Sequence, residues 1–170
     1  FRWSEGIAVE VETRLIAGDA LLRGRIKATT KNAPSGLLAV TFPVVKGIQP
    51  LTPQSRQDAI LHTQSFGRKT PSPLVSGEAS ITACPPGMQF TALTGDGMGL
   101  YFGEEDGQAN RKQLAWAADA DAESLGFSIN HQVLGWGGHE PVRECQSPGD
   151  IVWGSFQGNW YDAARIYRKW

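Results

Sequence analysis

The sequence has no membrane-length apolar run, no excess of charge of one sign and almost no cysteine. No apolar stretch approaches the roughly 20 residues that a transmembrane helix needs, so we expect no membrane partner. The 16 Lys and Arg residues are balanced by 17 Asp and Glu residues, which gives no general attraction for nucleic acid. The 170 residues are 41% hydrophobic and 19% charged, which is typical of one folded domain and not of a disordered chain.

The two cysteines, Cys84 and Cys145, are too few and too far apart for a disulfide framework. We interpret them as buried thiols, with a single disulfide as the alternative. The sequence leaves the cellular compartment open, and a periplasmic or secreted location is slightly favoured over a cytoplasmic one. The chain opens on Phe1 without a signal-peptide pattern and ends inside a predicted helix, so we expect a piece of a longer protein.

Motifs of the common enzyme classes are also missing. The sequence contains no GxSxG elbow, no phosphate-binding P-loop and no CxxC pair. His62, His131 and His139 lack the spacing of metal ligands, so we expect neither a metal nor a cofactor. Glu104, Glu105 and Asp106 could serve as paired carboxylates, but three adjacent acids in a turn are expected to be exposed to solvent.

Short segments with a period of two, separated by Gly and Pro, predict a mainly β fold. About ten strands at short spacing favour an antiparallel β-sandwich over alternating strands and helices. Thr94 to Gly97 is typical of a tight hairpin turn, and Pro43 predicts an edge strand or a bulge. The expected strands are Ile7 to Val11, Leu21 to Thr30, Leu37 to Val45, Ala79 to Ala83, Met88 to Leu93, Gly99 to Gly103, Arg111 to Trp116, Leu125 to His131 and Ile151 to Phe156, and Ala59 to Leu61 is one further short apolar piece.

The last dozen residues change to the period of a helix. Asn159 is a good N-cap, and Asp162 stands where the acid of a capping box belongs. A single helical face then carries aromatic and small side chains, namely Trp160, Ala163, Ala164, Tyr167 and Trp170. This amphipathic helix must cover an apolar surface.

Two segments without a clear strand pattern are candidate functional loops. Thr52 to Gly77 is polar, rich in proline and includes Arg68. Residues 135–140 form a glycine-rich stretch with Trp136 and His139, where an indole can stack on the apolar face of a sugar. A plain capping role for Trp136 is the alternative interpretation.

The closing segment, residues 154–170, resembles a junction in certain multidomain bacterial glycoside hydrolases. Members of that group often read F-x-G-D-W-Y-D-A-A-x-x-Y-R-x-W where an N-terminal β-sandwich meets a (β/α)8 barrel, and this chain reads F-Q-G-N-W-Y-D-A-A-R-I-Y-R-K-W. Two earlier stretches are similar to motifs of the same group. Residues 41–48 resemble a strand reading F-P-x-x-x-G-I, and residues 99–103 resemble G-L-Y-x-G/A.

The resemblance implies a galactose-mutarotase-like supersandwich over residues 1–157, with residues 158–170 beginning the helix that leads to the barrel. It also implies that the catalytic carboxylates lie on the barrel, so no catalytic residue is assigned in this chain. Trp160, Tyr167 and Trp170 would pack between sandwich and barrel, and Arg68, Trp136 and His139 are the candidate carbohydrate contacts. The alternatives are a stand-alone carbohydrate-binding module and a purely structural interaction domain.

Overall fold

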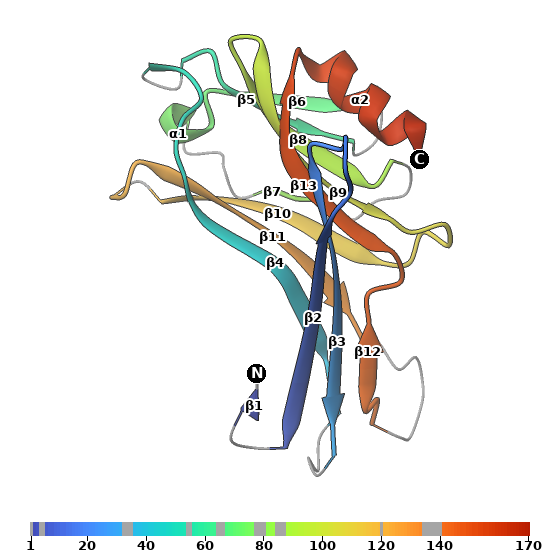
Figure 1. Cartoon of the computed structure of the whole chain (residues 1–170). Helices are drawn as coiled ribbons and strands as arrows, with labels where there is room; N and C mark the ends of the chain where they lie inside the picture. Colours follow the sequence, from blue (N-terminus) through green and yellow to red (C-terminus); the bar gives the residue numbers. More distant parts are fainter. Residues whose placement is uncertain are drawn as a thin grey trace.

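The structure is a computed structural model that describes residues 2–3, 6–31, 36–53, 56–63, 67–76, 81–83, 88–119, 121–133 and 141–170. Two antiparallel sheets and two helices make up this part of the chain (Figure 1). In spatial order, the larger sheet contains β1 (Arg2–Trp3), β2 (Ile7–Leu15), β3 (Leu21–Thr30), β13 (Asp150–Gln157), β9 (Met98–Glu105), β8 (Phe90–Gly95), β5 (Ala59–His62) and β6 (Arg68–Pro71), and β12 (Glu144–Gln146) also pairs with β3.

The smaller sheet lies across the larger one (Figure 1). Its strands, in spatial order, are β4 (Ala39–Ile48), β11 (Ser124–Gln132), β10 (Lys112–Asp119) and β7 (Ile81–Ala83). The helices are the short α1 (Pro73–Ser76) and α2 (Trp160–Lys169) at the end of the chain.

The core between the two sheets is apolar and draws on both of them. Phe102 of β9 stacks on Phe127 of β11 at 4.2 Å between ring centroids, and Trp116 of β10 meets Phe102 edge-on at 5.4 Å. The larger sheet also supplies Ile26, Ala28, Ile60, Leu93 and Ile151, and the smaller sheet supplies Val40, Ile48, Leu114, Leu125 and Ile129. The predicted antiparallel β-sandwich with a C-terminal helix is therefore confirmed.

Successive side chains of the larger sheet point to opposite faces, and the centre of this sheet is buried on both. Leu93, Phe102 and Ile151 face the core, whereas their neighbours Ala92, Tyr101 and Val152 belong to a second apolar cluster. That second cluster also contains Ala163 of α2. The helix is therefore a third layer on the outer face of the larger sheet.

Local signals in the sequence explain several of these elements. The β8–β9 hairpin turns at Asp96 and Gly97, whose φ angles of 45° and 75° fit the two-residue turn that favours a residue such as Asp followed by Gly. Pro43 lies on β4, at the edge of the smaller sheet, and the β4–β11 register shifts at two places. Both observations confirm the prediction from Pro43 of an edge strand or a bulge.

The expectation of a loop from Thr52 to Gly77 was wrong. β5, β6 and α1 all lie in that stretch, and β5 and β6 form a hairpin at the edge of the larger sheet. β6 has the sequence Arg-Lys-Thr-Pro and buries only Thr70. An edge strand with one buried side chain carries no apolar period that a sequence pattern could reveal.

The prediction that Glu104, Glu105 and Asp106 are all exposed was also wrong. Glu104 and Asp106 are 2% and 1% exposed, and Glu105 is half-buried. Glu104 has the same orientation on β9 as Phe102 and enters the core, whereas Glu105 points to the outer face. The pleat of the strand therefore gives these two adjacent acids different environments.

Lys112 connects the buried acids to the smaller sheet. Its Nζ lies 3.0 Å from Glu104 Oε2 and 2.8 Å from Asp106 Oδ2, and it also donates to Gln89 Oε1. Burial acts to raise the pKa of Asp106, but hydrogen bonds from Lys112 and from the N–H groups of Gln108 and Asn110 more than offset it, so the pKa is lowered.

His131 completes this buried cluster from β11. Its Nε2 lies 3.0 Å from Glu104 Oε2, and its Nδ1 lies 3.3 Å from the carbonyl oxygen of Val40. Both ring nitrogens of His131 therefore lie within hydrogen-bond distance of an oxygen atom.

We expect Lys112→Met to lower the free energy of unfolding by about 3–5 kcal/mol, because two buried carboxylates lose their cation. Chemical denaturation monitored by tryptophan fluorescence measures this difference. Lys46→Met is the matched control, since Lys46 is exposed on β4 and its loss should change stability by less than about 0.5 kcal/mol. Equal effects of the two substitutions would contradict a stabilising role of the buried cluster.

Candidate functional site

The start of α2 is fixed by its own sequence. Asn159 Oδ1 accepts from the N–H of Tyr161 at 2.8 Å, and Asp162 Oδ2 accepts from the N–H of Asn159 at 3.0 Å. The predicted capping box is therefore confirmed. Gly158 has φ +116°, and a Cβ atom there would lie 2.0 Å from Asp162 Oδ2. Only glycine suits this approach to the helix.

The inner face of α2 packs on the larger sheet of the same chain. Ala163 is fully buried, and the ring of Tyr167 lies 5.4 Å from that of Phe90. Phe90 in turn stacks on Tyr101 of β9 at 5.3 Å. Tyr167, predicted to lie at a domain interface, is thus in contact with its own sandwich.

The exposed side chains of α2 and of Trp170, which follows it, are aromatic or basic. Trp160, Tyr161 and Trp170 are 61%, 55% and 50% exposed. Three cationic residues, Arg165, Arg168 and Lys169, are exposed on the same helix. Trp160 and Trp170, the other two predicted interface residues, are exposed at the two ends of the helical face that carries Ala163 and Tyr167. We call the exposed side chains of α2 and Trp170, together with the hollow beside Trp160, the α2 surface.

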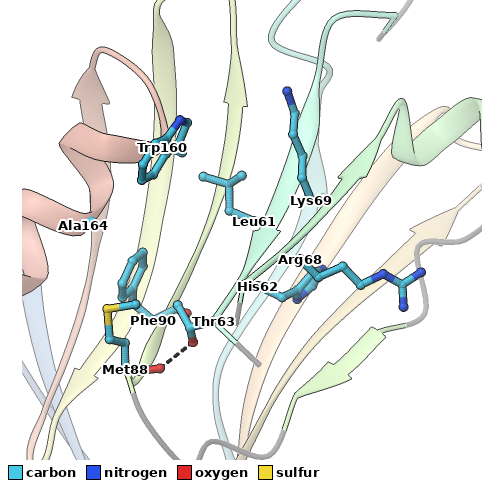
Figure 2. A pocket seen from close by; sticks show the side chains of 10 residues that line it. Leu61, His62, Thr63, Arg68, Lys69, Met88, Phe90, Trp160 and Ala164 are labelled. Atoms are coloured by element: carbon cyan, nitrogen blue, oxygen red, sulfur yellow. Dashed lines mark hydrogen bonds between the residues drawn. The ribbon is translucent and has the colours of Figure 1, made fainter. Parts of the chain in front are cut away.

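A hollow of about 340 Å³ lies between the start of α2 and the β5–β6 hairpin. Leu61, Met88 and Phe90 give it an apolar floor, and Trp160 stands at its side (Figure 2). Lys69 pairs with Leu61 across the hairpin, and Figure 2 shows both side chains on the side of Trp160. The arrangement suits an apolar side chain that enters beneath an indole.

The structure places Arg68, a predicted carbohydrate contact, on β6 at the border of this hollow. Its partner across the hairpin is His62, and Figure 2 shows the side chains of Arg68 and His62 close together, away from Trp160. The other two predicted contacts, Trp136 and His139, lie outside the described residues, as does Cys84. Cys145 is a free, half-buried thiol.

His62 is a buried residue that sequence reasoning missed. It is 3% exposed, and neither ring nitrogen has a hydrogen-bond partner among the described residues. Burial, and secondly the charge of Arg68, lower its pKa to about 4. The sequence did carry one signal, because His62 directly follows the apolar run Ala59 to Leu61 and so could belong to the same buried strand.

A second hollow of about 740 Å³ lies at the other end of α2. It is bounded by the turn between β2 and β3, by β9 and β13, and by Lys169 and Trp170. In contrast to the first hollow, it combines ion pairs with apolar walls. The two ends of the helix thus carry two surfaces of different chemistry.

A scan against models of known protein families finds no match to this chain, and a search of curated proteins finds no significant similarity. Neither described helix is long and apolar enough to cross a membrane. In the described ranges, no group of three His, Cys, Asp or Glu side chains is placed to hold a metal ion.

We expect His62 to make the fold less stable in acid. An unfolded histidine takes up a proton near pH 6.5 and the folded one only near pH 4, so the free energy of unfolding falls as the pH falls between these values. The expected loss due to His62 is about 2–3 kcal/mol between pH 7 and pH 4.5.

Urea denaturation of the parent chain and His62→Gln at both pH values measures this contribution. The variant should lose less stability on acidification than the parent, by that amount. Arg68→Gln should have a smaller effect in the same direction, because it removes the second cause of the lowered pKa. The same acid dependence in the parent and in His62→Gln would refute the assignment.

Proposed function

We propose that this chain is a non-catalytic β-sandwich domain of a glycoside hydrolase that braces a catalytic (β/α)8 barrel through the α2 surface. The carrying observation is that α2 is anchored to the sandwich through Ala163 and Tyr167 while Trp160, Tyr161 and Trp170 stay exposed. The resemblance of residues 154–170 to the sandwich–barrel junction supports the choice of partner.

The α2 surface has the composition of a protein interface. Trp, Tyr and Arg are enriched where proteins meet, and a few aromatic anchors in fitted pockets supply most of the binding energy. Here the exposed indole of Trp160 stands beside the hollow floored by Leu61, Met88 and Phe90. We infer that an apolar side chain of the barrel enters this hollow.

Charge gives the expected character of the facing surface. Lys69, Arg165, Arg168 and Lys169 are exposed around the aromatic residues, whereas the chain as a whole carries a net charge of -1. Asp162 offsets part of this charge, because its Oδ1 lies 3.6 Å from Arg165 Nη1. A barrel surface with exposed Asp and Glu residues would complement this face.

The α2 surface should become protected when the complete protein encoded by the gene is prepared. We expect residues 160–170 to exchange amide hydrogens more slowly there than in the 170-residue chain, and acrylamide to quench Trp160 and Trp170 less. Activity on nitrophenyl glycosides should be found only in the complete protein. Identical exchange in both forms, or a gene that encodes no barrel, would rule out the proposal.

Trp160→Ala should weaken the contact with the barrel by about 2 kcal/mol, the loss typical of an aromatic anchor. The same substitution in the 170-residue chain should change stability little, because the side chain is mostly exposed. Leu38→Ala, at an exposed residue outside α2, is the control for both forms. Thermal unfolding of the two forms measures the difference.

In the same proposal, Trp136, His139 and Arg68 are the residues that could reach the carbohydrate cleft of the barrel. Trp136→Ala in the complete enzyme should then lower kcat/KM. An unchanged kcat/KM would remove Trp136 from the cleft without affecting the bracing role of α2.

A further inference from the structure

The second hollow, of about 740 Å³, gathers polar groups from separate elements of the fold. Asp19 comes from the turn between β2 and β3, Arg23 from β3, Glu105 from β9 and Ser155 from β13. Lys169 and Trp170 close the hollow from the end of α2. Its volume lies within the range typical of small-molecule sites, about 300–1,000 Å³.

The charged groups of this hollow hold one another in place. The Arg23 guanidinium donates through Nη1 to Asp19 Oδ2 and through Nη2 to Glu105 Oε1, the latter at 3.2 Å. Asp19 Oδ1 also accepts from the N–H of Leu21 at 3.1 Å. These side chains are 15–28% exposed, so a ligand would meet donors and acceptors that are already oriented.

The charges in the hollow cancel. Asp19 and Glu105 supply two carboxylates, and Arg23 and Lys169 supply two cations. An anion would face the carboxylates and a cation would face the guanidinium, so neither is favoured by net charge. A wholly apolar ligand would strip water from the ion pairs without replacing its hydrogen bonds. The hollow therefore suits a neutral ligand with many hydroxyl groups.

The remaining walls are apolar. Trp170 is half-exposed, and Leu21, Phe156 and Ile166 also line the hollow. An indole wall with a guanidinium and carboxylates beside it suits a ring with an apolar face and a polar edge. A pyranose has this character, because its C–H groups lie on the ring faces and its hydroxyls at the edge.

We propose that this hollow binds a single neutral sugar unit, with hydroxyls bonded to Glu105 and Arg23 and a C–H face against Trp170. The proposal does not rest on the bracing function, because every residue involved belongs to the described sandwich and to α2. This hollow is also distinct from the predicted carbohydrate contacts. Arg68 lines the first hollow, at the other end of α2, and Trp136 and His139 lie outside the described residues.

Saturation-transfer NMR on the 170-residue chain tests the proposal, with D-glucose, D-galactose, D-mannose and maltose as separate probes up to about 50 mM. At least one sugar should bind, with glycerol as the control for a generic polyol. Trp170→Ala should weaken that binding about fivefold or more through loss of the ring contact. Trp160→Ala, at the other hollow, should leave it unchanged.

Glu105→Gln supplies a second variant of nearly the same shape, and it should also weaken binding. Circular dichroism and thermal unfolding identify any variant that has lost its fold. If Glu105→Gln does not fold, Trp170→Ala still tests the proposal, because Trp170 is half-exposed and its loss should leave the fold intact. No transfer from any of the four sugars, equal transfer from glycerol, or a loss with Trp160→Ala but not with Trp170→Ala would overturn the proposal.

Discussion

The ammonium group of Lys112 joins the two sheets of the sandwich. Lys112 lies on β10 of the smaller sheet, and its side chain contacts Glu104 of β9 and Asp106 in the turn after β9. His131 of β11 also contacts Glu104. Because these groups are almost fully buried, each charge depends on the others for the solvation that water would otherwise give. The apolar core tolerates many relative positions of two sheets, whereas these hydrogen bonds and ion pairs require specific distances between β9, β10 and β11.

The centre of the larger sheet is apolar on both faces, and α2 lies where it covers the second of these faces. One face covers the core shared with β4, β10 and β11, and the other would leave Phe90, Ala92, Tyr101 and Val152 in water without the helix. The helix needs only a narrow stripe, Ala163 and Tyr167 with their neighbours, to cover them. Trp160, Tyr161 and Trp170 stay half-exposed or more, so these aromatic side chains add little to that packing, and we regard them as contacts to a partner.

The sequence predicted the elements whose signals are local. The capping pair Asn159 and Asp162, the Asp96–Gly97 turn and the alternating strands could all be identified because each signal lies within a few residues. β6 was missed because an edge strand with one buried residue has no apolar period. Glu104 was missed for a different reason, since its burial depends on Lys112 and His131, which are neighbours only in the folded chain. No local pattern distinguishes Glu104 from Glu105.

Successive side chains of β9 point to opposite faces of the sheet, so this one strand contributes both to the interior and to a candidate site. Glu104 points inward and joins the sheets, and Glu105 points outward and holds Arg23 at the second hollow. A ten-residue helix is only about 15 Å long, so α2 presents Trp160 to the first hollow and Trp170 to the second as one rigid element. Because α2 is capped at its start and packed through Ala163 and Tyr167, its position on the sheet fixes one wall of each hollow.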